Sequence, residues 1–307
     1  MIETVGLGRK FESTMAVEDL SLSIKDGEAF AFLGPNGAGK TTTVRMLCCL
    51  IAPTSGTAYL DRLDIRDPEA QLQIRQRIGL LPENPGLYES LGAYRNLDFF
   101  ARLYGVSAQD RQRRITELLK TLNLWERKDE AVGKFSKGMK QKVAIARALV
   151  HEPEYIFLDE PTAALDPEAA KTVREFLLEL KKEGRTIFLN THNLDEAQRV
   201  CDRIGVLRTK LLAVGTPDEL ASRFFGHATA IQLRQVRPEH LQMLRSLPNV
   251  MDARQEDSSL VVQSADPKND NPLIVSKLVA MGAEVSYVED VKRSLEDIYL
   301  KLVGGGT

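Results

Sequence analysis

The chain has 307 residues, a length that allows one large domain and one small one. Its composition is 43% hydrophobic and 27% charged, and its net charge of −2 gives no electrostatic argument for binding nucleic acid or an anionic membrane. No apolar run approaches the roughly 20 residues that cross a bilayer, and the N-terminus lacks a basic-then-apolar signal pattern. The three cysteines show no metal-ligand spacing, so we expect a protein of the reducing cytoplasm.

The first informative stretch is a glycine-rich loop near residue 34. Residues 30–33 form a short apolar run of the strand type, and apolar residues recur at helical spacing after Lys40. The backbone N–H groups of such a loop and the N-terminus of the following helix form a cradle for phosphate. The alternative is a flexible turn before a core helix. The match to G-x-x-x-x-G-K-[ST] is complete, and the stretch consists of Gly34, Pro35, Asn36, Gly37, Ala38, Gly39, Lys40, Thr41 and Thr42.

Short apolar runs alternate with amphipathic stretches up to about residue 214, which predicts an α/β domain with a largely parallel sheet. We expect this domain to cover residues 1–222, with a helical subdomain at about 85–150 that includes helical spacing over 97–124. The predicted strands are residues 30–33, 77–81, 155–158, 186–190 and 203–207.

After residue 217 the pattern gives a short helix and then restarts, so we expect a small α+β domain over residues 226–303. The predicted strands of this domain are residues 228–236 and 259–265, and its predicted helices are residues 271–282 and 294–303. A polar loop is expected over residues 265–272. Ser294 and Asp297 resemble a capping box at the last helix.

A second signal follows the fully apolar run 155–158, where Asp159 and Glu160 stand at the end of a predicted strand. Ligands of open parallel sheets bind at that edge. In P-loop enzymes an acidic residue there holds Mg²⁺ together with the loop hydroxyl, here Thr41, and Glu160 is then placed to polarise an attacking water. A solvated acidic turn is the alternative.

A third signal is Ser136 and Gly138 directly before an amphipathic helix. A serine hydroxyl, a glycine N–H and a helix N-terminus make a second anion site. Taken alone this is an ordinary capped helix, and only its position shortly before the acidic strand favours the functional interpretation.

Together these motifs resemble the ATP-binding subunit of an ABC transporter over the first 215 or so residues. Residues 34–42 resemble the Walker A loop, 135–139 the signature, 155–160 Walker B and 164–166 the D-loop, which includes Asp166. His192 falls where the family carries its switch histidine, and Phe11 where an aromatic residue stacks on adenine.

Three residues depart from the family pattern. Glu83 stands at the position of the Q-loop glutamine, where its carboxylate can accept from a water or approach Mg²⁺. In the signature, Lys137 and Met139 replace glycine and glutamine. Ser136 and Gly138, which would touch phosphate, match the family pattern. Residues 81–88, 136–141 and 294–303 resemble the subclass that serves drug, polysaccharide and cell-surface export permeases.

The resemblance implies ATP and Mg²⁺ as cofactors and a head-to-tail dimer, with a homodimer expected. Lys40 would hold the β and γ phosphates; Thr41, Asp159 and Glu83 would serve the metal; Glu160 would be the general base, and His192 would contact the γ-phosphate. The transport path would belong to a separate integral membrane permease that holds the subunit on the inner face of the membrane. We expect no nucleic-acid partner, and we expect the tail to regulate the protein or support the dimer.

Several alternatives stay open at this point. Within transport, the main one is an importer rather than an exporter. Outside it, a soluble ABC ATPase would usually show two cassettes or a long coiled coil, and neither is present. A P-loop GTPase would need an N-K-x-D element, which is missing. A regulator that binds ATP without turnover is disfavoured by Glu160.

Overall fold

The computed structural model describes residues 1–84, 86–163, 165–291 and 293–304. Pro85, where the predicted helical subdomain begins, and Ala164 of the predicted D-loop lie outside this part of the chain. The chain forms two compact units, Met1–Thr216 and Pro217–Thr307. Helix α8 (Pro217–Phe225), which contains the predicted end of the first domain at residue 222, belongs to the second unit.

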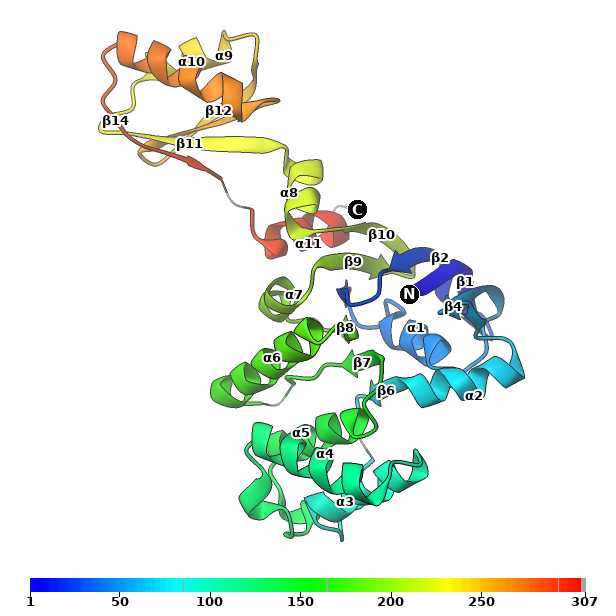
Figure 1. Cartoon of the computed structure of the whole chain (residues 1–307). Coiled ribbons are helices and arrows are strands. Elements are labelled where there is room, and N and C mark those ends of the chain that lie inside the picture. The colour runs from blue at the N-terminus through cyan, green and yellow to red at the C-terminus, as the bar shows by residue number, and fades with distance from the viewer. Residues whose placement is uncertain (85, 164, 292, 305–307) are drawn as a thin grey trace. The chain divides into compact units, whose positions relative to one another are not determined.

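The first unit alternates strands and helices, as Figure 1 shows from blue to green. Its strands are β1 (Ile2–Phe11), β2 (Thr14–Ile24), β3 (Ala29–Leu33), β4 (Ser55–Leu60), β5 (Leu63–Asp64), β6 (Ile78–Leu81), β7 (Tyr155–Asp159), β8 (Thr186–Asn190), β9 (Arg203–Arg208) and β10 (Lys210–Gly215). Its helices are α1 (Lys40–Leu47), α2 (Pro68–Arg77), α3 (Ala93–Leu103), α4 (Ala108–Thr121), α5 (Lys137–Leu149), α6 (Pro167–Lys182) and α7 (Leu194–Val200), with 3-10 turns η1 (Trp125–Arg127) and η2 (Val132–Lys134). The predicted α/β class is confirmed, and β3, β6, β7, β8 and β9 correspond to the five predicted strands.

Two sheets build this unit. One has the order β2-β1-β4-β5 and is antiparallel. The other has the order β10-β9-β3-β8-β7-β6, and all its neighbours are parallel except β10 and β9. Helices α1 and α2 lie on one side of the parallel strands and α6 and α7 on the other (Figure 1). Because both faces are covered, β3, β7 and β8 are buried throughout, which explains their continuous apolar runs.

Aromatic side chains of the parallel strands pack on the face that α1 covers. Phe32 and Phe188 meet edge to face at a centroid distance of 5.1 Å, and both belong to one buried cluster with Phe157 and with Met46 of α1. Side chains alternate between the two faces of a strand. Asp159, two residues after Phe157, therefore points to the same face, toward the start of α1.

Helices α3, α4 and α5 pack on one another as a separate helical group. The predicted helical spacing over residues 97–124 corresponds to α3 and α4, with a turn between them. This group places the predicted signature at the start of α5.

The second unit contains α8, β11 (His227–Leu233), α9 (Pro238–Arg245), β12 (Val250–Glu256), β13 (Ser259–Ser264), α10 (Pro267–Ala280), β14 (Val285–Asp290) and α11 (Leu295–Gly304). Its antiparallel sheet has the order β12-β13-β11-β14. The predicted capping box forms, because the N–H of Asp297 donates to Ser294 Oγ over 3.1 Å and the N–H of Ser294 donates back over 3.0 Å.

The polar loop expected over residues 265–272 is wrong, because α10 begins at Pro267. Asp266 caps this helix by accepting from the N–H of Asn269, and a proline is favoured at the first helical position, where its missing N–H leaves no bond unmade. The proline and the run of polar residues therefore mark a helix start rather than a loop.

Candidate active site

The glycine loop joins β3 to α1 as predicted. Gly37 and Gly39 have φ angles of 79° and 98°, a region that other residues rarely adopt. A Cβ on Gly39 would lie 2.3 Å from the carbonyl oxygen of Ala16, so only glycine fits the approach of the two backbones. Lys40 Nζ donates to the carbonyl oxygens of Gly34 and Pro35, over 2.6 Å and 3.1 Å. Burial lowers the pKa of Lys40, against the raising influence of the carboxylates of Glu160 and Asp159.

Thr41 and Asp159 come together at the carboxyl edge of the parallel sheet. Thr41 lies in the first turn of α1 and Asp159 ends β7. The Thr41 hydroxyl donates to Asp159 Oδ2 over 2.8 Å, and Asp159 is buried. A hydroxyl and a carboxylate at this spacing are the oxygen ligands that Mg²⁺ prefers. The described residues contain no group of three or more His, Cys, Asp or Glu that could hold a metal ion.

Glu160 and His192 form a second pair at the same edge. His192 Nδ1 lies 2.7 Å from Glu160 Oε1, and the His192 N–H donates to the same oxygen over 3.1 Å. The Glu160 backbone N–H donates to the carbonyl oxygen of Asn190 over 2.9 Å. Glu160 has a φ of 51°, which is strained for a residue with a side chain and is typical of functional sites. Asn193 also caps α7, so the cap and the contact to Glu160 are both present.

Gln141 of α5 is a member of this site that the sequence did not indicate. Its Nε2 donates to the carbonyl oxygens of Glu160 and Pro161, over 3.1 Å and 3.3 Å. Helix α5, which begins with the predicted signature, is thereby hydrogen-bonded to the backbone of Glu160. Its position five residues after Ser136, on the same helix, is the only sequence signal that could have suggested it.

The remaining predicted residues lie in other environments. Ser136 caps α5 by accepting from the Met139 N–H over 3.2 Å, and Gly138 lies in that helix. Asp166 caps α6, and the hydrogen bond from the Ala169 N–H holds its pKa below the usual range.

Phe11 and Glu83 are accessible. Phe11 ends β1, is 42% exposed and has the Arg9 guanidinium 4.5 Å from its ring centroid. Glu83 is exposed in the bend after β6. In the described part of the chain, no hydrogen bond joins it to Thr41 or Asp159.

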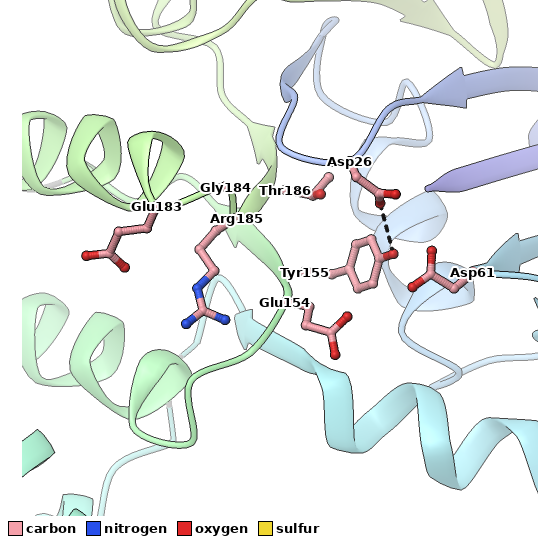
Figure 2. A pocket seen from close by; sticks show the side chains of 8 residues that line it. All are labelled: Asp26, Asp61, Glu154, Tyr155, Glu183, Gly184, Arg185 and Thr186. Atoms are coloured by element: carbon pink, nitrogen blue, oxygen red, sulfur yellow. Dashed lines mark hydrogen bonds between the residues drawn. The ribbon is translucent and has the colours of Figure 1, made fainter.

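A cavity of about 220 Å³ lies at the opposite edge of the same sheet, where β7 and β8 begin. Figure 2 shows the Tyr155 hydroxyl directed at Asp26, with Asp61 nearby and Glu183 turned away. Tyr155 Oη and Asp26 Oδ1 are 3.2 Å apart, and Arg77 pairs with Asp61 and with Glu154. Both Asp61 and Glu154 are therefore already paired with a cation, and none of the predicted site residues lines this cavity.

The chain is similar to proteins of known family. Residues 17–163 match a family model described as ABC transporter. The linearmycin resistance ATP-binding protein LnrL of Bacillus subtilis (strain 168) is 31% identical over 309 residues, which cover 99% of this chain and 98% of that protein. The chain belongs to the ABC transporter family.

Two further relatives of this ABC ATPase extend the match. The Nod factor export ATP-binding protein I of Ralstonia nicotianae (strain ATCC BAA-1114 / GMI1000) is 32% identical, covering 99% of this chain and 94% of that protein. A dimeric ATP-binding cassette, solved in a post-hydrolysis state with ADP and Pi bound, has a TM-score of 0.64 and 28% identity, covering 70% of this chain and 98% of that chain. The chain is therefore the ATP-binding and ATP-hydrolysing subunit of an ABC transporter. Among the described residues, no helix is both long and apolar enough to span a membrane.

Proposed function

We propose that this subunit powers export, by ATP-driven dimerisation coupled to a separate integral membrane permease. The observation that carries the proposal is the extent of its similarity to export-related subunits. The relatives named for linearmycin resistance and for Nod factor export match 99% of the chain, so the match includes the second unit as well as the cassette. Import is the direction that the experiment below has to exclude.

The nucleotide is held at the carboxyl edge of the parallel sheet. The loop amides and Lys40 bind the β and γ phosphates, and Lys40 exchanges its present carbonyl partners for phosphate oxygens. Thr41 and Asp159 hold Mg²⁺, and their 2.8 Å hydroxyl–carboxylate contact fits that ion. When bound, the ion neutralises charge on the phosphates. Phe11 stacks on adenine, for which its exposed ring at the end of β1 is suited.

Hydrolysis uses Glu160 as the general base. Its carboxylate takes a proton from a water whose oxygen attacks the γ-phosphorus, while the bond to the ADP oxygen breaks. In the structure that carboxylate lies 2.7 Å from His192 Nδ1. The side chain of His192 is 75% exposed, so it is free to turn toward the γ-phosphate when ATP arrives. Glu83, also exposed at the edge of the site, serves the metal or the attacking water.

Two copies complete two sites. Ser136 and Gly138 at the start of α5 form an anion site that has no phosphate partner within its own chain, so they face the triphosphate held by a second subunit. Asp166, at the exposed N-terminus of α6, lies at the same interface. One chain carries both halves of the site, which favours a homodimer, and we assign the second unit a regulatory or dimer-supporting role.

The permease places the subunit on the cytoplasmic face of the membrane. The test is to purify the tagged chain from detergent-solubilised membranes of its source cells, identify the membrane protein bound to it, and reconstitute the pair in vesicles. We expect ATP added to the subunit's side to drive a panel of amphipathic substrates to the opposite side. Transport toward the subunit would show an importer, and ATP hydrolysis that no membrane protein alters would contradict the proposal.

A further inference from the structure

Asn190 is the last residue of β8, and its side chain is out of contact with solvent. It has an exposed fraction of 0%, and neither its Oδ1 nor its Nδ2 has a hydrogen-bond partner in the described residues. Its backbone, in contrast, is bonded, since its carbonyl oxygen accepts from the Glu160 N–H. Burying an unpaired amide is costly, so such a group indicates a partner that arrives with a ligand.

The register of the sheet places this amide beside the metal ligands. Asn190 is the cross-strand partner of Asp159 on one side and of Phe32 on the other. Paired residues of parallel strands project to the same face. Phe188, two residues before Asn190, packs in the cluster that includes Met46 of α1. The Asn190 side chain therefore lies on the α1 face, next to the Asp159 carboxylate.

The two cross-strand neighbours of Asn190 differ in polarity. Phe32, on one side, has a buried apolar ring. On the other flank, Asp159 Oδ2 accepts from the Thr41 hydroxyl. An amide offers an acceptor oxygen and two donor hydrogens, which suits a shell of water molecules. The hydration shell of a divalent cation held by Thr41 and Asp159 would supply such partners at this position.

We propose that the carboxamide of Asn190 binds the hydrated Mg²⁺ held by Thr41 and Asp159, as an outer-shell partner of the metal. The inference rests on the proposed magnesium site and adds to it a residue that fixes the ion. It explains why an asparagine with no partner of its own is kept in the interior beside a carboxylate.

The test compares ADP affinity in EDTA with ADP affinity in saturating Mg²⁺, measured by titration calorimetry, and takes the ratio as the magnesium enhancement. Outer-shell partners of metals typically contribute about 10–100-fold in affinity. We expect Asn190→Ala and Asn190→Leu to lower the enhancement by about tenfold and to leave the affinity in EDTA within twofold of wild type.

Asn96 provides the matched control. It is also 0% exposed, but its amide accepts from the Tyr88 N–H and donates to the carbonyl oxygens of Tyr88, Leu91 and Gly92. We expect Asn96→Ala to lower the unfolding temperature without nucleotide and to keep the enhancement. Asn190→Leu should keep or raise that temperature, because it removes an unpaired polar group.

The possible outcomes distinguish the proposed magnesium site from the proposed role of Asn190. An unchanged enhancement in both Asn190 variants, with the wild type responding to Mg²⁺, would overturn the role of Asn190 alone. So would an equal loss of ADP affinity in EDTA and in Mg²⁺, which would point to phosphate or to a structural role. A wild-type enhancement of one would overturn the magnesium site itself, and with it both proposals.

Discussion

The amino and carboxyl edges of the parallel sheet both carry glutamate side chains, but these glutamates have different partners. Strand β7 is preceded by Glu154 and followed by Glu160. Glu154 is bound by the guanidinium of Arg77, with contacts of 3.0 Å and 2.5 Å. The carboxylate of Glu160 instead lies against the ring of an exposed histidine, His192. The amino edge has the cavity, and positive φ angles occur at both edges, at Asp61 and Glu152 as well as at Glu160. The unpaired amide of Asn190 lies at the carboxyl edge.

This difference between the two edges shows that the position of a cavity does not indicate the functional site of this protein. At the amino edge Asp61 and Glu154 are already paired with Arg77, so a ligand would have to displace stabilising contacts. At the carboxyl edge, among the residues that the structure describes, Lys40 Nζ donates to backbone carbonyl oxygens and the side chain of Asn190 has no hydrogen-bond partner. That edge can gain free energy by binding an anion and its metal, and the predictions below test this contrast.

The largest contrast in ATP affinity is expected between two cations that each bind two backbone carbonyl oxygens. Lys40 binds those of Gly34 and Pro35 at the carboxyl edge, and Arg185 Nη1 binds those of Glu152 and Pro153, both over 3.0 Å, at the amino edge. Hydrogen bonds to charged groups contribute about 1.5–3 kcal/mol. Lys40→Ala should therefore weaken ATP binding by about 10- to 100-fold in calorimetry, whereas Arg185→Ala should lower only the unfolding temperature. Equal ATP affinities in the two variants would remove the distinction between the edges.

A smaller effect is expected at the link between α5 and Glu160. Gln141→Leu leaves the carbonyl oxygens of Glu160 and Pro161 without their donor. If this bond positions the general base, kcat should fall by about fivefold while KM for ATP stays within twofold, since a bond of about 1 kcal/mol is lost from the reacting arrangement. Gln71→Leu is the control, because Gln71 Nε2 also donates to a backbone oxygen, that of Ile65, away from the site. A rise in KM with unchanged kcat would show that Gln141 serves binding instead.

The smallest effect is expected at the amino edge, in the pH dependence of stability. Burial alone raises the pKa of Asp61, but hydrogen bonds from the Met1 ammonium, Tyr155 and Arg77 lower it to about 2. A lowered carboxyl pKa stabilises the fold above the unfolded value of about 3.9, and this stabilisation is lost as the pH falls toward 2. Asp61→Asn should cost under about 1 kcal/mol at pH 6, because partly exposed pairs contribute little. In urea unfolding the difference from wild type should vanish near pH 2, and a difference that grows as the pH falls would reverse the sign of the argument.

The sequence predicts the parts of this fold whose signals are local. The apolar runs of β3, β7 and β8 and the glycine loop are visible because buried parallel strands leave little choice of residue. β14 is nearly all exposed and carries no alternation, so its sequence gave no strand prediction. The start of α10 was missed because Pro267 and its polar neighbours were interpreted as a loop.

The same division applies to the site. Residues that act through their chemical type, such as Thr41, Asp159 and Glu160, stand in motifs. The features that single out Asn190 and Gln141 depend on the fold. The unpaired amide of Asn190 results from packing and strand register, and the hydrogen bond of Gln141 is made to a carbonyl oxygen distant in sequence. Apart from the position of Gln141 five residues after Ser136, the order of residues along the chain does not indicate these contacts.

The central claim, that chemistry belongs to the carboxyl edge, is tested most directly by steady-state ATP hydrolysis of Glu160→Gln and Glu154→Gln at saturating Mg²⁺ and ATP. The two changes are chemically identical and lie at opposite ends of β7. General-base catalysis contributes about 10²–10⁴-fold, so Glu160→Gln should lose that factor while Glu154→Gln stays within about threefold of wild type. Turnover by Glu160→Gln within threefold of wild type, or equal losses in the two variants, would contradict the account.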